Sequence, residues 1–341
     1  MQIKKMLAMA VAVAVASTLT LTGCGDDKAS GDSGSKTLIR VSHAQIDSHP
    51  DHIGLVAFKN EIEKKLGNKY EVQIFPNASL GANEKVLQLI KQGSVQFLVV
   101  STANVESFYK RYAVFSIPYL FTSENTYEKF ISDPKILQEL GTDSAKNGFV
   151  PVAAFTAGTR NFYSKTPIRT VEDLAGKKFR VQAGPTNVSM MNAFGAAATP
   201  MSFGEVYSAL QQGVIDGAEN NELALTDQKH GEVCKYFTYD GHQMCPDLLV
   251  GSYAFLSKLS PEDAKVFEDA AKIAQKTEFE AWHKSVDDAI AKATKMGVKF
   301  IKDVDTNQFR EKVLPLHQEL LKANPAMQAL YDKASAFNSA N

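Results

Sequence analysis

This chain of 341 residues has little cysteine, almost no excess of charge and none of the short motifs of common enzymes. Lysine and arginine together number 37, against 38 aspartates and glutamates, and no basic block stands out. Nucleic acids bind to surfaces with a strong positive field, so this balance argues against a nucleic acid as partner. Any site for an anion must therefore be built from a few local cations.

Catalytic signatures are missing as well. The sequence contains no GxGxxG, no P-loop, no HExxH and no GxSxG. Many nucleotide-binding enzymes, zinc proteases and α/β-hydrolases carry one of these patterns. Their absence weakens an enzymatic interpretation without excluding it, and we expect no cofactor.

One group of side chains has the composition of a metal site. It comprises His43, Asp47, His49, Asp51 and His52. The alternative is a polar loop that follows a strand, with Ser48 or Asp51 capping the next helix. We favour the loop and expect no metal.

The chain has three cysteines, Cys24, Cys234 and Cys245. In an oxidising compartment the last two are able to form a disulfide, and two separate buried thiols fit the sequence equally well. A zinc site is not expected, because no CxxC accompanies them.

The N-terminus indicates export. Lys4 and Lys5 precede the uncharged run MLAMAVAVAVASTLTLTG, which has the order of a signal peptide. Its end, Leu21-Thr22-Gly23-Cys24, is similar to a bacterial lipobox, in which cleavage leaves an acylated cysteine. We therefore predict a lipoprotein signal peptide over 1–23 and a flexible Gly-, Ser- and Asp-rich tether over 24–36. An ordinary signal with an unrelated cysteine is the alternative.

Strands and helices are expected to alternate from Thr37 onward, which predicts an α/β fold. About 300 residues usually divide into two domains. Gly93 is expected to end the helix that begins near residue 82, and a Ser-x-x-Asp cap opens a helix that runs to about Gly297. Strands are expected at 38–44, 70–76, 94–100, 149–155, 177–183 and 214–220.

Two segments repeat one pattern. Residues 83–101 and 203–220 both run from an amphipathic helix through Gln-Gly to a short apolar strand. Ligands of open α/β sheets lie beyond the carboxyl ends of the strands. Residues that follow Val99 and Ile215 are therefore expected to face a shared cleft between two similar lobes.

Two arginines follow apolar strands and are candidates for binding an anion. Arg160 lies in FTAGTRNFY and Arg180 in GKKFRVQAG. The guanidinium group keeps its charge and its planar fork matches a carboxylate. Both side chains are also compatible with an exposed position at the edge of the sheet.

A family resemblance rests on long motifs. AGTRNFYSKTPIRTVEDLAGKKFRVQ, MNAFGAAATPMSFGEVYSALQQGVIDGAENN, FPNASLG and IPYLF resemble the DctP-type solute-binding proteins of TRAP transporters. The resemblance implies a periplasmic receptor whose two lobes close on an organic acid through a hinge and deliver it to a membrane permease driven by an ion gradient. It also implies a long C-terminal helix that spans both lobes. We predict one lobe from 37–157 with about 246–285, and the other from 158–245 with about 286–341.

The resemblance assigns the ligand-binding residues. Arg180 matches the arginine that pairs with the ligand carboxylate, and Arg160 matches a second contacting arginine. Asn220 matches an asparagine that reaches the carboxylate or a hydroxyl, and Phe203 matches an aromatic that packs on the ligand. Asn220 as the cap of the following helix and Phe203 as a core residue are the alternatives.

From the first lobe the resemblance adds His43, Gln45 and Ser101 as cleft residues, and the polar set with Asn104 is suited to ligand hydroxyls. Acids next to a bound anion would weaken its binding. We therefore expect Glu219 and Glu222 to point away or to bind hydroxyls.

The ligand is expected to be a sugar acid of the uronate or aldonate type. A C4-dicarboxylate, presentation of a ligand to a sensor kinase, and an enzyme acting on sugar acids are the alternatives. We expect a monomer that touches the membrane only through its lipid anchor and its permease.

Overall fold

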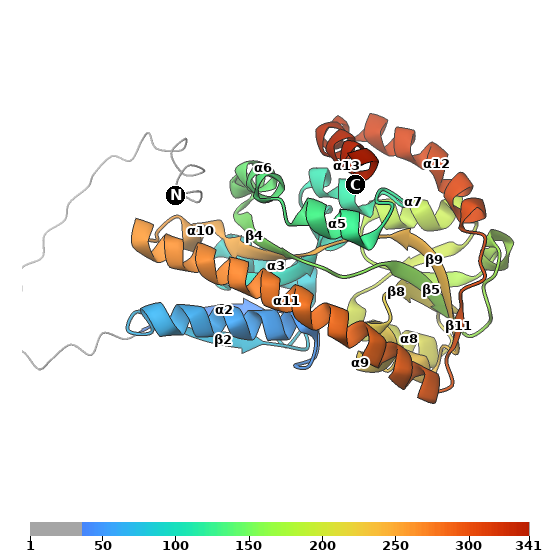
Figure 1. Ribbon diagram of the computed structural model, residues 1–341, viewed down its shortest axis with the longest axis horizontal. Coiled ribbons are helices and arrows are strands. Elements are labelled where there is room, and N and C mark those ends of the chain that lie inside the picture. Colours follow the sequence, from blue (N-terminus) through green and yellow to red (C-terminus); the bar gives the residue numbers. More distant parts are fainter. Residues whose placement is uncertain (1–35, 341) are drawn as a thin grey trace, which may run out of the picture.

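The computed structural model describes residues 36–340, and in that part of the chain two β-sheets form the centres of two lobes (Figure 1). The first sheet has the strand order β2-β1-β3-β10-β4. β1 pairs in parallel with both β2 and β3, whereas β10 is antiparallel to β3 and β4. Its strands are β1 (Thr37–Ser42), β2 (Tyr70–Phe75), β3 (Phe97–Ser101), β4 (Phe149–Phe155) and β10 (Asp247–Ser252).

The second sheet has the order β11-β9-β5-β8-β6-β7. β8 lies parallel to β6 and antiparallel to β5. The chain therefore crosses between the lobes after β4 and returns after β9, which makes both lobes discontinuous in sequence. The strands are β5 (Arg160–Ser164), β6 (Lys178–Val181), β7 (Ala197–Pro200), β8 (Gly217–Asn220), β9 (Tyr236–Gln243) and β11 (Lys299–Ile301).

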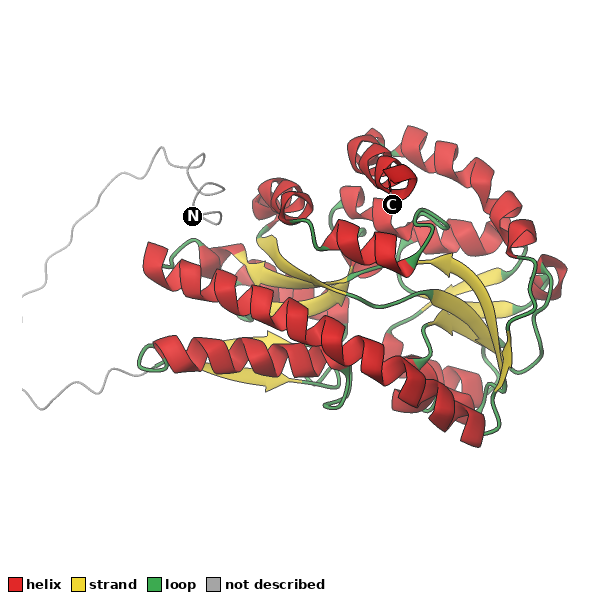
Figure 2. Ribbon diagram, in the orientation of Figure 1, coloured by secondary structure: helices red, strands yellow, loops and turns green. Residues whose placement is uncertain are grey.

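Helices cover the faces of both sheets, as Figure 2 shows. Each sheet can bury its apolar faces only against such a layer, which is why strands and helices alternate. The helices are α2 (Pro50–Leu66), α3 (Asn83–Gln92), α4 (Thr102–Val105), α5 (Glu124–Ile131), α6 (Pro134–Ser144), α7 (Pro185–Ala193), α8 (Val206–Gln211), α9 (Leu223–Asp227), α10 (Tyr253–Leu256), α11 (Pro261–Lys295), α12 (Thr306–Ala323) and α13 (Gln328–Ala340).

The long helix α11 joins the two lobes (Figure 1). Its N-terminus is capped as predicted, because the Ser260 hydroxyl accepts a hydrogen bond from the Asp263 amide at 3.1 Å. With 35 residues it is roughly 50 Å long. It packs along α2 in the first lobe and reaches α9 in the second. The predicted two-lobed α/β fold with a spanning helix is confirmed.

The last helices pack across the lobe boundary. α12 contacts α7 of the second lobe, whereas α13 lies against α5 beside the first sheet. Leu321, Met327 and Leu330 belong to the same apolar cluster as Tyr112 and Phe130. The lobe boundaries remain a prediction, but the final residues, which we had placed in the second lobe, make their core contacts with the first.

The two related helix-strand segments adopt the same local structure. α3 ends at Gly93 with φ of 78°, and the turn after α8 contains Gly213 with φ of 73°. Glycine takes this left-handed conformation without steric cost, so both helices stop there. β3 and β8 follow, one in each sheet.

Three further expectations concern sulfur and the N-terminus. Cys234 and Cys245 are free, which corrects the possible disulfide: Cys234 lies in the core around Phe237, and the Cys245 Sγ donates to the Phe115 carbonyl at 3.1 Å. The predicted signal peptide, most of the tether and the lipobox residue Cys24 lie outside the described residues. Within residues 36–340, no helix combines the length and the apolar character needed to cross a membrane.

Candidate functional site

A cavity of about 160 Å³ lies between the lobes, where β3, β6 and β8 end. The ends of the two related segments meet there, because Ser101 closes β3 and Asn220 closes β8. The predicted shared cleft is thus present. Its wall contains Gln45, Asn83, Glu84, Ser101, Asn104 and Asp247 from the first lobe, Arg160, Arg180, Gln182, Phe203, Glu205 and Asn220 from the second, and Trp282 from α11.

Arg180 is a buried cation that forms no ion pair with any residue of the described range 36–340. Its side chain is only 3% exposed, and its Nε and Nη2 donate to the Met201 carbonyl at 3.1 and 3.0 Å. The ring centroid of Phe203 lies 5.6 Å from the guanidinium carbon. Among the described residues no carboxylate lies within ion-pair distance, and Nη1 makes no hydrogen bond. Burial lowers the pKa of Arg180 against the attraction of Glu219, because loss of hydration disfavours the charged form.

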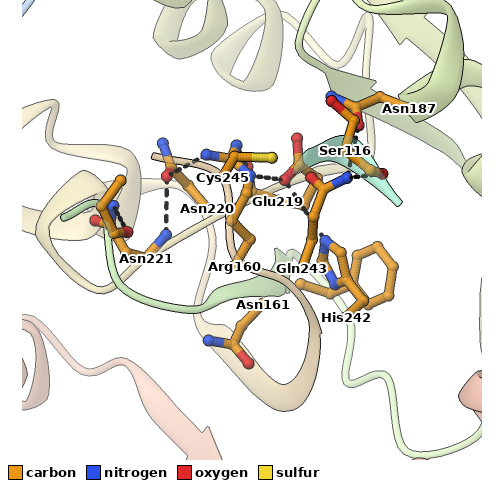
Figure 3. A network of polar contacts seen from close by, with 12 residues as sticks. Ser116, Arg160, Asn161, Asn187, Glu219, Asn220, Asn221, His242, Gln243 and Cys245 are labelled. Atoms are coloured by element: carbon orange, nitrogen blue, oxygen red, sulfur yellow. Dashed lines mark hydrogen bonds and ion pairs between the residues drawn. The ribbon is translucent and has the colours of Figure 1, made fainter. Parts of the chain in front are cut away.

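Arg160 also lines the cavity, and all three of its guanidinium nitrogens donate hydrogen bonds within the protein. Nε donates to the Glu219 carboxylate at 2.5 Å, and Nη2 donates to the Glu219 carbonyl at 2.8 Å. Nη1 donates to the Asn220 side-chain oxygen at 3.0 Å, as Figure 3 shows. The charge of Arg160 is therefore compensated within the protein, although the residue lines the cavity.

Glu219 is held between two cations. It is fully buried, and its carboxylate lies 3.6 Å from the His242 Nε2. Burial raises the pKa of Glu219, but Arg160 and His242 outweigh burial and bring it to about 2. Burial likewise opposes protonation of His242, yet Asp240, at 2.7 Å from Nδ1, and Glu219 raise its pKa to about 9. The four side chains form a neutral set of two cations and two anions.

Asn220 and Phe203 both reach the cavity. The Asn220 side-chain oxygen accepts from the Asn221 amide at 2.9 Å, and α9 begins at Leu223 without a side-chain cap. Asn220 is therefore not the cap of that helix. Phe203 is partly buried, packs edge-on against His230 with centroids 5.7 Å apart, and presents its ring to Arg180.

Three of the four predicted first-lobe residues line the cavity: Gln45, Ser101 and Asn104. His43 does not. Its Nε2 lies 2.9 Å from the His52 Nδ1, so the ring is engaged in a histidine pair. The neighbouring His49 lines the cavity instead, and burial lowers its pKa to about 3, so it is neutral.

His49 also corrects the expected helix cap. Its Nδ1 accepts a hydrogen bond from the Asp51 amide at 3.2 Å, and it occupies the N-cap position of α2 in place of Ser48 or Asp51. The described residues contain no group of three or more histidine, cysteine, aspartate or glutamate side chains able to hold a metal ion.

The first-lobe wall carries acids that sequence reasoning missed. Asp247, at the start of β10, and Glu84, at the start of α3, line the cavity. The Asn104 Nδ2 donates to the Glu84 carboxylate at 2.5 Å. Burial raises the pKa of Asp247 to about 6, against the attraction of Arg160. This wall offers hydrogen-bond acceptors and disfavours a second anionic group.

Glu219 and Glu222 were expected to avoid a bound anion. Neither lines the cavity, and both are buried. Sequence reasoning did not find that Glu219 neutralises Arg160. No local pattern gives this pair, because Arg160 and Glu219 are 59 residues apart and meet only when β5 pairs with β8.

Comparison with known proteins adds the family. Residues 41–324 match the model of the bacterial extracellular solute-binding proteins, family 7 (DctP). The chain is 38% identical to the uncharacterized protein YiiZ of Salmonella typhimurium over 88% of its own length and 92% of that protein. It is 32% identical to the C4-dicarboxylate-binding periplasmic protein DctP of Vibrio cholerae, over 71% and 72% of the two chains.

A solved structure is similar over the whole folded part. The TRAP periplasmic solute-binding protein of Anaerococcus prevotii, which contains bound D-glucuronate, shares 44% identity and superimposes with a TM-score of 0.87. The match covers 89% of this chain and 99% of that one.

Proposed function

The chain belongs to the DctP family of extracytoplasmic solute-binding proteins of TRAP transporters, and we propose that its ligand is a hydroxylated monocarboxylate, foremost a hexuronate. The single observation that carries this proposal is the buried Arg180 guanidinium, which has no anionic partner among the described residues and borders the cavity. A buried charge is stable only when it is paired, so the partner is expected to come from the ligand.

The opposite wall favours hydroxyl groups over a second carboxylate. Glu84 and Asp247 accept hydrogen bonds, and Asn104 and Gln45 add amide groups. Two carboxylates at about 4 Å repel each other strongly in a cavity of low polarity. A C4-dicarboxylate would place its second charge against these acids, whereas a sugar acid would place hydroxyls there.

The relatives support the same ligand class. The Anaerococcus protein holds D-glucuronate and is 44% identical, whereas the dicarboxylate-binding Vibrio protein is 32% identical over a shorter match. Arg180, Arg160, Asn220, Phe203, Gln45, Ser101 and Asn104 are our proposed ligand-binding residues.

We propose binding without bond making. The described cavity combines an unpaired cation, acceptors and an aromatic ring, and closure of the lobes on the ligand presents one conformation to the permease. Recovery of unchanged glucuronate after long incubation with the purified protein checks the absence of catalysis. Conversion of the acid would overturn it.

The lipid anchor is a separate proposal from the Leu-Thr-Gly-Cys sequence at residues 21–24. Labelled palmitate incorporated by cells into the wild-type chain but not into Cys24→Ser would support the anchor. Equal membrane release of both chains would contradict it. Gel filtration with light scattering tests the expected monomer.

The ligand is tested by thermal unfolding of the purified chain against uronates, aldonates and C4-dicarboxylates. A ligand at about a thousand times its dissociation constant stabilises the folded state by roughly 4 kcal/mol. We expect the largest rise in melting temperature with a uronate. A larger rise with succinate or malate would overturn the sugar-acid assignment.

A further inference from the structure

The two lobes also touch each other beside the cavity. The segment after β3 (residues 103–107) meets the segment after β6 (residues 182–186). The Thr186 amide donates to the Glu106 carboxylate at 2.7 Å, and the Ser107 hydroxyl donates to the Ala183 carbonyl at 3.2 Å. Each of these bonds joins one lobe to the other.

Glu106 supplies a cap that its partner helix lacks. The first amides of a helix have no acceptor within the helix, and the N-terminus attracts negative charge. The N-cap residue of α7 is Gly184, which has no side chain to accept a bond. The Glu106 carboxylate, only 4% exposed, takes this role from the opposite lobe.

The first lobe leaves no space for a side chain at Gly184. A Cβ atom there would lie 2.7 Å from the Ala103 carbonyl oxygen and 3.0 Å from the Glu106 carboxyl carbon. Its backbone angles, φ of −96° and ψ of 133°, are allowed for any residue. Glycine is therefore required by the contact between the lobes and not by the local backbone.

The contact is continuous with the cavity wall, because Asn104 and Gln182 belong to the same two segments and both line the cavity. We propose that Glu106 and Gly184 form an interlobe latch, in which the Glu106 carboxylate caps α7 when the lobes close and so retains the ligand. Glu106 does not line the cavity and acts as a positioning residue. The latch proposal depends on the proposed function only in the choice of D-glucuronate as the ligand for its test.

The test measures affinity for D-glucuronate, dissociation rate and ligand-free melting temperature for four variants, beginning with Glu106→Ala and Gly184→Ala. Since a charged hydrogen bond contributes roughly 1.5–3 kcal/mol, Glu106→Ala is expected to raise Kd about tenfold to a hundredfold, mainly through faster dissociation. Gly184→Ala is expected to weaken binding at least as much. Both are expected to lower the ligand-free melting temperature much less than the ligand-bound one, because the contact lies outside the core of either lobe.

Asp173→Ala is the matched control. The Asp173 carboxylate also accepts backbone hydrogen bonds, from Arg169 and Thr170 at 2.8 and 3.0 Å, but within one lobe. This variant is expected to lower the melting temperature and to keep Kd. Glu106→Gln keeps an acceptor for the Thr186 amide and should restore most of the affinity. An unchanged Kd in Glu106→Ala and Gly184→Ala would overturn the latch.

Failure of the ligand assignment is separable from failure of the latch. If the wild-type protein binds no glucuronate, the ligand proposal fails, and this result says nothing about the latch. Small-angle X-ray scattering then tests the latch without ligand: Gly184→Ala should have a larger radius of gyration than wild type. Identical scattering curves would overturn the latch on their own.

Discussion

The two walls of the cavity differ in charge. The second lobe contributes the guanidinium groups of Arg160 and Arg180 together with the acid Glu205, whereas the first lobe contributes acids and neutral amides but no arginine or lysine, among the residues that line the cavity. Two lobes that share one helix-strand segment therefore form walls of different charge. The difference indicates how a sugar acid is oriented, with its carboxylate toward the second lobe and its hydroxyls toward the first.

Within the second lobe, Arg160 and Arg180 differ in the partners of their guanidinium groups. Both are 3% exposed and line the same cavity. Arg160 belongs to a neutral set with Glu219, His242 and Asp240, whereas Arg180 donates only to a backbone carbonyl. Both arginines line the cavity, but only Arg180 lacks an ion-pair partner among the described residues, so we propose Arg180 as the principal contact for the ligand carboxylate.

The largest effect is expected from Arg180→Met. Removal of two charged hydrogen bonds to a ligand carboxylate should raise Kd for glucuronate roughly a hundredfold to ten-thousandfold. Because the lost charge has no partner in the described protein, the ligand-free melting temperature should stay the same or rise. Titration calorimetry and thermal unfolding give the two values. Retained affinity would remove Arg180 from the site.

Arg160→Met should have the opposite signature. It leaves Glu219 buried without its guanidinium partner, which costs about 3–5 kcal/mol of folding stability. Urea denaturation measures this loss. The second substitution Glu219→Gln should recover part of it, because the unpaired charge is then gone. If Arg160→Met has the same free energy of unfolding as wild type, the Arg160–Glu219 pair does not stabilise the fold, and the proposed difference between the two arginines is wrong.

The sequence predicted features that depend on local patterns, and it did not predict contacts that depend on long-range strand pairing. The local strand pattern predicted Arg160 and Arg180 as candidates, and the family resemblance added Asn220 and Ser101; all four line the cavity. The spanning helix and the helix-strand repeat were also local signals. Partners that depend on long-range pairing were not found.

Asp247 illustrates the limit. It reaches the cavity because β10 inserts antiparallel between β3 and β4, where Asp247 lies opposite Ser101, 146 residues earlier in the chain. The position of its side chain in the cavity could not be predicted without knowing how β10 pairs with β3 and β4. Trp282, in the middle of a 35-residue helix, had no distinguishing spacing. His43 does not line the cavity, and its contact with His52 was not predicted from the sequence.

The neutral set around Arg160 predicts a pH dependence of stability. The folded pKa of His242, about 9, is raised above its ordinary value of 6.5. Its contribution is therefore fully present below pH 6.5 and is lost as pH rises through 9, by up to about 3 kcal/mol. Urea unfolding between pH 6 and 10 should show this loss in wild type and a flatter profile in His242→Gln. Parallel profiles would contradict the charged state of His242.

The smallest effect concerns the opposite wall. Asp247→Asn replaces an acid in the cavity by a neutral amide, which should improve binding of succinate and weaken that of glucuronate by about threefold to tenfold each, as for a single hydrogen bond or ion contact. Glu205→Gln is the control, because Glu205 also borders the cavity but its carboxylate accepts a hydrogen bond from the Ser202 hydroxyl at 2.5 Å. The ratio of the two affinities, measured by calorimetry, should change for Asp247 and not for Glu205. An equal change in both would mean that overall charge, and not the position of Asp247 in the first-lobe wall, sets the preference for one carboxylate.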